Sequence, residues 1–144
     1  MRIIKEGRLK ASCESIEFFK KYYRSIGKVN YFVLYYSERE WKINPDLYHQ
    51  YVIVIGEYVQ LWMSGLTWGY NGTGPTDLRE LMNMIDPEIT CKQIRDLEWM
   101  VDDPIVFENV NGRLTLKPFN EKVRSLLCDQ DNRLPWSIKG FLYN

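Results

Sequence analysis

The chain has 144 residues, of which 45% are hydrophobic and 26% are charged, and its formal net charge at pH 7 is zero. These values fit one globular domain with a single core, and they disfavour nucleic acid or an anionic membrane surface as the main partner. We find no apolar run long enough to span a membrane and no signal segment at the N-terminus, so we expect a cytoplasmic protein.

The first third of the chain predicts a helix, a strand and a loop. Apolar side chains recur at helical spacing over residues 13–26, and Ser12 stands in position to cap that helix. The next run, 29–36, is β-branched, aromatic and almost continuously apolar, which is typical of a central strand. Residues 37–46 are polar and predict a loop, in which Trp41 packs against the body of the domain.

Two pairs of apolar runs predict β-hairpins. Residues 51–55 and 58–63 are separated by a short turn that contains glycine. The runs 106–110 and 113–116 are separated by an Asn-Gly pair, the strongest short-range signal for a hairpin turn. Both hairpins favour an antiparallel sheet.

Three more helices follow from the pattern. Residues 76–85 carry an apolar stripe and come directly after Pro75, which opens the helix. Another helix is predicted from residue 87 to about residue 101, with Asp86 as its N-cap. Residues 119–127 form the last amphipathic helix.

The mixture of helices and hairpins defines the expected fold class. A short strand at residues 136–138 closes the chain. We predict a single α+β domain over residues 1–144, with a mostly antiparallel sheet built from hairpins and packed by about four helices. Residues 1–45 are expected to form an N-terminal helix–strand extension, and residues 48–140 the motif-bearing core.

The most unusual segment is 66–75, Leu-Thr-Trp-Gly-Tyr-Asn-Gly-Thr-Gly-Pro. Three glycines within six residues permit backbone angles that other residues avoid, and two aromatic side chains add contact surface. A glycine loop before a helix start exposes N–H groups, so the amides from Gly72 to Thr76 could hold an anion. The other interpretation is a tight turn in which Thr73 caps the helix and Trp68 fills the core.

We define this segment, residues 66–75, as the glycine–aromatic loop. It supplies all but one of the candidate residues for binding a ligand or partner, and the helix that follows supplies the other. The candidates are Trp68, Tyr70, Asn71, Gly72, Thr73, Gly74 and Thr76.

Residues 51–85 resemble an uncharacterised family of bacterial and phage proteins. Its hallmark is a short hairpin, then the motif aromatic-x-W-G-Y-x-G-[ST]-G-P, then an amphipathic helix. Leu66 departs from this motif, because an aromatic residue is expected there. A looser likeness covers Phe119, Val123 and residues 134–138. The resemblance implies a phage or mobile-element protein that acts inside a bacterial cell, and it implies no particular activity.

Metal and cofactor sites are not expected. The cysteines are Cys13, Cys91 and Cys128. They lie far apart and lack the paired spacing of a disulfide framework or a zinc site. His49 is the single histidine, so few ligands remain for a transition metal. A site for a hard cation stays open, although no loop signature supports it. Its aspartates would be Asp46, Asp77 and Asp102.

Catalysis finds little support in the pattern. His49 has no neighbour that would position it as a general base. Asp102 and Asp103 precede Pro104, an order more typical of a helix end than of a catalytic carboxylate pair. A small hydrolase that uses Asp or Glu residues is the alternative that the sequence leaves open.

The leading expectation is a non-enzymatic binding protein that modulates a host protein of the bacterial cell, as an inhibitor of host defence, through the glycine–aromatic loop. The first alternative is sequestration of a phosphorylated or nucleotide-like molecule, with the Thr73–Thr76 amides on phosphate and Trp68 or Tyr70 on a base. Another alternative is a minor virion or assembly component that forms homo-oligomers through a sheet edge.

Overall fold

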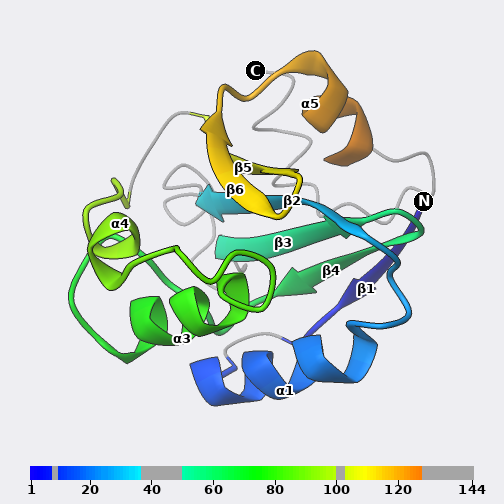
Figure 1. Ribbon diagram of the computed structural model, residues 1–144. Helices are drawn as coiled ribbons and strands as arrows, with labels where there is room; N and C mark the ends of the chain where they lie inside the picture. Colours follow the sequence, from blue (N-terminus) through cyan, green and yellow to red (C-terminus); the bar gives the residue numbers. More distant parts are fainter. Residues whose placement is uncertain (8–9, 37–49, 100–102, 128–144) are drawn as a thin grey trace, which may run out of the picture.

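The computed structural model describes residues 1–7, 10–36, 50–99 and 103–127 (Figure 1). The strands are β1 (Arg2–Lys5), β2 (Val29–Tyr36), β3 (Gln50–Gly56), β4 (Val59–Met63), β5 (Ile105–Val110) and β6 (Arg113–Lys117). The helices are α1 (Ser12–Tyr22), α3 (Thr73–Met82), α4 (Cys91–Arg95) and α5 (Glu121–Leu127). The predictions that lie outside the described residues concern the 37–46 loop with Trp41 and Asp46, His49, Asp102, Cys128 and residues 134–138.

The predicted α+β fold with a mostly antiparallel sheet is confirmed. The strand order is β1-β4-β3-β2-β5-β6. β1 pairs with β4 in parallel, and the other neighbouring strands of the described sheet are antiparallel. β2 lies between β3 and β5, so residues 29–36, which the prediction assigns to the N-terminal helix–strand extension, form a central strand of the sheet.

Helices cover both faces of the sheet. In Figure 1, α1 and α3 lie below the sheet, α4 lies at the left, and α5 lies above it. Alternate residues of β2, such as Phe32 and Leu34, belong to the core between the sheet and the helices α1, α3 and α4. Tyr31 and Val33 belong to the second core, which α5 closes. Burial on both faces explains why β2 reads as a continuous apolar run.

The start of α1 differs from the prediction. Ala11 is the N-cap, and Ser12 is the first helical residue. The Glu14 carboxylate accepts a hydrogen bond from the Ala11 N–H at 3.1 Å, so a side chain inside the helix satisfies that group. The Ser12 hydroxyl donates instead to the carboxylate of Asp77 on α3. Ser12 therefore joins two helices and is not an N-cap.

The prediction of a helix from residue 87 to about residue 101 is wrong in extent. Within the described residues 87–99, only Cys91–Arg95 is α-helical, and Thr90 is its N-cap. The Thr90 hydroxyl accepts a hydrogen bond from the Gln93 N–H at 3.2 Å, and the Gln93 side chain accepts one from the Thr90 N–H at 2.8 Å. This reciprocal capping box places the helix start four residues later than the Asp-Pro pair suggests.

Asp86 has a different function from the predicted cap. Asp86 as a whole residue is 2% exposed. One carboxylate oxygen accepts a hydrogen bond from the Glu88 N–H at 3.0 Å, and the other accepts one from the Leu114 N–H on β6 at 2.9 Å. Asp86 therefore attaches the segment before α4 to the edge of the sheet.

Both predicted hairpins are confirmed. β3 and β4 are joined at Glu57 and Tyr58, one residue later than expected. β5 and β6 are joined by Asn111, with φ 54°, and Gly112, with φ 85°. Positive φ at both turn residues matches a type I′ turn, which suits the right-handed twist of the strands. No helix in the described part of the chain is long and apolar enough to cross a membrane.

Candidate functional site

The helix after the glycine–aromatic loop begins earlier than predicted. Gly72 is the N-cap of α3, and Thr73 is the first helical residue, so the predicted cap by Thr73 is wrong. The Gly72 carbonyl accepts hydrogen bonds from the Thr76 N–H at 3.2 Å and from the Thr76 hydroxyl at 2.8 Å. The loop is therefore shorter than the sequence suggests, and its last three residues, Thr73, Gly74 and Pro75, belong to the first turn of α3.

Trp68 belongs to the core. Its side chain is 0% exposed, and its indole N–H donates to the Glu98 carbonyl at 3.0 Å. Its ring packs against Trp99 with 4.7 Å between the centroids. The prediction that Trp68 lines a functional surface is therefore corrected, because the indole has no exposed face for a base or a partner.

Two glycines of the loop allow close packing. A Cβ on Gly74 would lie 1.8 Å from the Thr67 hydroxyl oxygen, which shares a 2.8 Å hydrogen bond with the Tyr70 hydroxyl. Gly69 has φ +86°, and its N–H donates to the Ile94 carbonyl of α4 at 3.1 Å. These positions require glycine because the loop lies tightly against its own side chains and against α4.

The loop offers little room for an anion. Pro75 has no N–H, and the Thr76 N–H is already bonded to the Gly72 carbonyl. The hollow beside α4, bordered by Tyr70 and Arg95, has a volume of about 20 Å³. That space suits roughly one water molecule, whereas pockets for organic ligands measure about 300–1,000 Å³. Two of the five positions from Gly72 to Thr76 therefore cannot donate an N–H to an anion, and the hollow beside them has no room for a nucleotide.

Four of the predicted candidates stay accessible to a partner. Tyr70 is 48% exposed, and Asn71, Thr73 and Thr76 are also exposed. Gly74 is buried, and Gly72 is half-buried. The accessible part of the loop is thus a small polar surface around one aromatic ring, beside α4.

We expect Gly74→Ala to lower the free energy of unfolding by about 1–3 kcal/mol, as overpacking does. Adding Thr67→Ala removes the hydroxyl that the new methyl group meets, so the double variant should regain part of the loss. Urea titration of both single variants and the double variant measures this coupling. If Gly74→Ala lowers the free energy of unfolding equally in the parent and in the Thr67→Ala variant, the contact with the Thr67 hydroxyl is not the cause.

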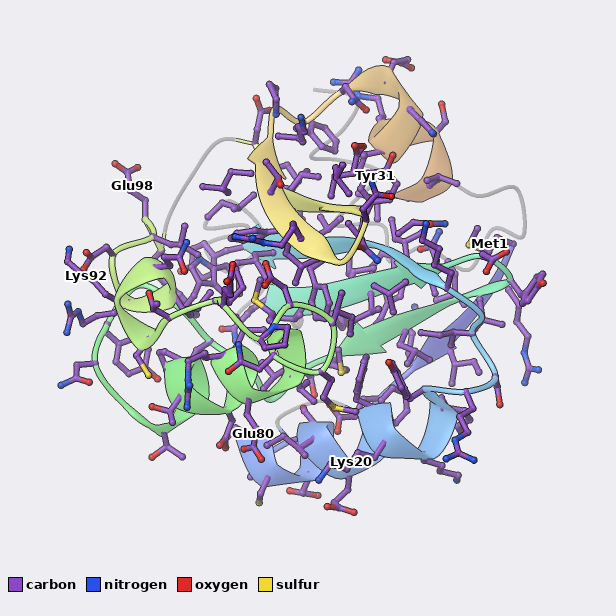
Figure 2. The ribbon with its side chains drawn as sticks, in the orientation of Figure 1. Met1, Lys20, Tyr31, Glu80, Lys92 and Glu98 are labelled. Atoms are coloured by element: carbon purple, nitrogen blue, oxygen red, sulfur yellow. The ribbon has the colours of Figure 1, made fainter. Side chains whose placement is uncertain are left out.

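The larger hollow lies on the other side of α4, between that helix and β6. We name it the α4–β6 groove, and its volume is about 510 Å³. Its lining residues are Lys92, Gln93, Asp96, Leu97, Phe107, Leu114, Thr115 and Leu116. Figure 2 shows Lys92 projecting from α4 into solvent, at the end of the molecule away from Met1. The volume lies within the range of known binding pockets.

The floor of the groove is apolar. Phe107 on β5 pairs with Leu116 on β6, so both side chains point to the same face of the sheet. Phe107 is 3% exposed, whereas Leu116 is 56% exposed. The helix α4 has only 5 residues, which limits how much of this face it can cover. A large apolar side chain is left open to solvent there.

The outer edge of β6 is mostly blocked. The antiparallel register of β5 and β6 directs the backbone N–H and C=O groups of residues 113, 115 and 117 toward β5. The same groups of residues 114 and 116 point outward, away from the sheet. The Asp86 carboxylate already accepts a hydrogen bond from the outward Leu114 N–H, and Pro118 has no N–H to donate. Within the described residues, the outward N–H of Leu116 has no hydrogen-bond partner. One open position therefore stands directly beside the groove.

Charged side chains form one rim of the groove. The Lys92 ammonium lies 2.6 Å from one Asp96 oxygen, and the Arg95 guanidinium lies 3.3 Å from the other. The hydrogen bonds from Lys92 and then from Arg95 lower the pKa of the Asp96 carboxyl below its ordinary value. The two charged residues that line the groove, Lys92 and Asp96, have opposite signs and form an ion pair.

Sequence reasoning did not find the groove. Its floor depends on how little of the sheet α4 covers, and the apolar pattern around that helix suggests a much longer one. The Thr90-x-x-Gln93 capping box is the signal that places the true start of α4. Within the described residues, no group of three or more His, Cys, Asp or Glu side chains is arranged to hold a metal ion.

Comparison of the chain with family models, with curated proteins and with solved structures gives no match. The resemblance of residues 51–85 to a bacterial and phage family therefore stays a prediction.

Proposed function

We propose that this protein is a non-catalytic binding protein whose partner protein docks on the side of the domain that carries α4. An extended segment of the partner occupies the α4–β6 groove, and the exposed part of the glycine–aromatic loop contacts the same partner on the other side of α4. The phage and bacterial resemblance makes a protein of a bacterial host, such as a defence component, the first partner to test.

One observation carries this proposal: the exposed Leu116 side chain and the outward Leu116 N–H lie together at the groove. A segment that adds to an edge strand gains backbone hydrogen bonds, while its alternate side chains enter neighbouring pockets. Here the apolar floor at Phe107 and Leu97 would receive such a side chain. Asp86 and Pro118 limit the open edge, so pairing is confined to a short stretch around Leu116.

The glycine–aromatic loop extends the same surface. Cys91 and Arg95 of α4 border the hollow next to Tyr70, whereas Lys92 and Asp96 of α4 border the groove. The helix therefore lies between the two features, and a partner that covers α4 can reach both. Exposed tyrosine is one of the residues that contribute most to protein interfaces.

Capture of partners from a bacterial lysate tests this function. The immobilised protein is compared with Leu116→Glu, which places a charge on the groove floor, and with Tyr58→Glu as a matched control. Like Leu116, Tyr58 is a large hydrophobic residue that is exposed, but it lies in the β3–β4 turn outside the groove. We expect one or more proteins to be retained by the parent and by Tyr58→Glu, and at least tenfold less by Leu116→Glu.

Thermal unfolding of all three proteins shows whether each variant is folded before capture is compared. Equal retention by Leu116→Glu and the parent would place the binding surface elsewhere. Retention of a second copy of this chain, lost in Leu116→Glu, would assign the groove to an oligomer rather than to a host protein.

A further inference from the structure

A second cavity lies away from α4, between α5 and the ends of β2, β3 and β5. Its volume is about 370 Å³. Figure 2 shows Tyr31, one of its lining residues, close to α5. The other lining residues that matter here are Asn30, Ile55, Glu57, Glu108, Lys122 and Leu126. Four separate elements and one turn therefore build a space large enough for a small organic molecule.

The cavity lies where β2 is irregular. The register between β2 and β3 shifts between Val29 and Tyr31, so Asn30 is an extra residue in the strand. The Asn109 side chain donates a hydrogen bond to the Val29 carbonyl at 2.7 Å, which holds this irregular end in place. A bulge bends the strand and re-aims its side chains, and bulges are frequent next to binding sites.

Charges of opposite sign border this cavity without pairing with one another. Glu57 and Glu108 come from the sheet side, and Lys122 comes from α5. Glu57 accepts a hydrogen bond from the Lys28 N–H at 2.7 Å. Among the ion pairs of the described residues, none joins Lys122 to either glutamate, so these groups lie more than 4 Å apart. Met1 also lines the cavity and carries the α-ammonium of the chain, so the lining has two carboxylates and two positive groups, and Lys122 stays separate from both glutamates.

We propose that this cavity binds a free α-amino acid. The ammonium group of the ligand pairs with the carboxylates of Glu108 and Glu57, and the carboxylate of the ligand pairs with Lys122. Such a zwitterion matches both signs of charge at once, whereas a simple anion or cation satisfies one side and meets repulsion from the other. Leu126 supplies an apolar wall for the ligand side chain.

The test uses the twenty free amino acids as probes, each added separately to the full chain while thermal unfolding is followed. A ligand that binds the folded state raises the midpoint in a concentration-dependent manner. Calorimetric titration then gives the affinity of the best probe. We expect Glu108→Gln and Lys122→Met each to weaken that affinity at least tenfold.

Matched controls place the same changes outside the cavity. Glu80→Gln on α3 and Lys20→Met on α1 remove exposed charges from the opposite face of the sheet (Figure 2), and we expect both to bind as the parent does. The amide of the best probe, which lacks the carboxylate, should bind the parent weakly and should lose nothing further in Lys122→Met. The proposal is overturned if no amino acid raises the midpoint, or if Glu108→Gln and Lys122→Met bind as tightly as the parent.

This site is independent of partner docking. Its residues lie around α5, and the variants that remove it leave the α4–β6 groove intact. Failure of the amino-acid test therefore leaves the proposed partner surface standing, and loss of partner capture in Leu116→Glu leaves this cavity standing.

Discussion

Trp68→Ala is expected to lower the free energy of unfolding by about 3–5 kcal/mol, the usual cost of truncating a buried large aromatic side chain. The indole is completely buried, packs against Trp99 and donates to the Glu98 carbonyl. Removing it leaves a cavity below the glycine–aromatic loop and takes away the hydrogen-bond donor to the Glu98 carbonyl. Urea titration, monitored by circular dichroism, measures the loss.

Tyr70→Ala is the control for Trp68→Ala, because it removes an aromatic side chain from the same loop. Tyr70 is half exposed, so we expect a loss within about 1 kcal/mol. Comparable losses for the two variants would contradict the assignment of Trp68 to the core and Tyr70 to the surface.

Asp86→Ala is the second large effect, with an expected loss of about 2–4 kcal/mol. The buried carboxylate accepts hydrogen bonds from the Glu88 N–H and the Leu114 N–H. It also lies 3.6 Å from the Arg113 guanidinium. Alanine leaves the Leu114 N–H without an acceptor at a buried position, and the segment before α4 loses its attachment to β6.

Glu88→Ala separates the buried contact from the exposed one. Glu88 also pairs with Arg113, at 2.5 Å, but both side chains are exposed. Exposed ion pairs contribute about 0–1 kcal/mol, so we expect a small effect on the same urea titration. If Glu88→Ala costs as much as Asp86→Ala, the hydrogen bond to Leu114 is not what holds this segment.

Local signals predicted much of the fold. The Asn111-Gly112 pair placed the β5–β6 hairpin because both residues adopt the positive φ that a two-residue turn requires. The continuous apolar run at 29–36 predicted a central strand, and β2 is one, with cores on both faces. In each case the signal lies in consecutive residues of the sequence.

Predictions failed where a distant group decides the structure. Asp86 precedes a proline and so resembles a helix cap, but its carboxylate is used by an N–H of β6, 28 residues away in the chain. Ser12 also resembles a cap, yet its hydroxyl donates to Asp77 on α3. Polar side chains of this kind satisfy whichever backbone or side-chain group the fold brings near, and periodicity carries no information about that group.

The candidate site was predicted in part. The glycine–aromatic loop stays a predicted binding segment, and two of its glycines serve contacts with Thr67 and α4. The α4–β6 groove could not be predicted, because it depends on how far α4 extends over β5 and β6. Leu116 looked like an ordinary strand residue, and only the packing around it shows that it is exposed.

Amide hydrogen exchange in the complex with a captured partner tests the central claim most directly. The Leu116 N–H points outward and has no partner within the described residues, so its exchange should be fast in the free protein. If a partner strand pairs with β6, exchange at Leu116 should slow at least tenfold, and the amides of α4 should also be protected. A stable complex in which exchange at Leu116 is unchanged would contradict docking in the α4–β6 groove.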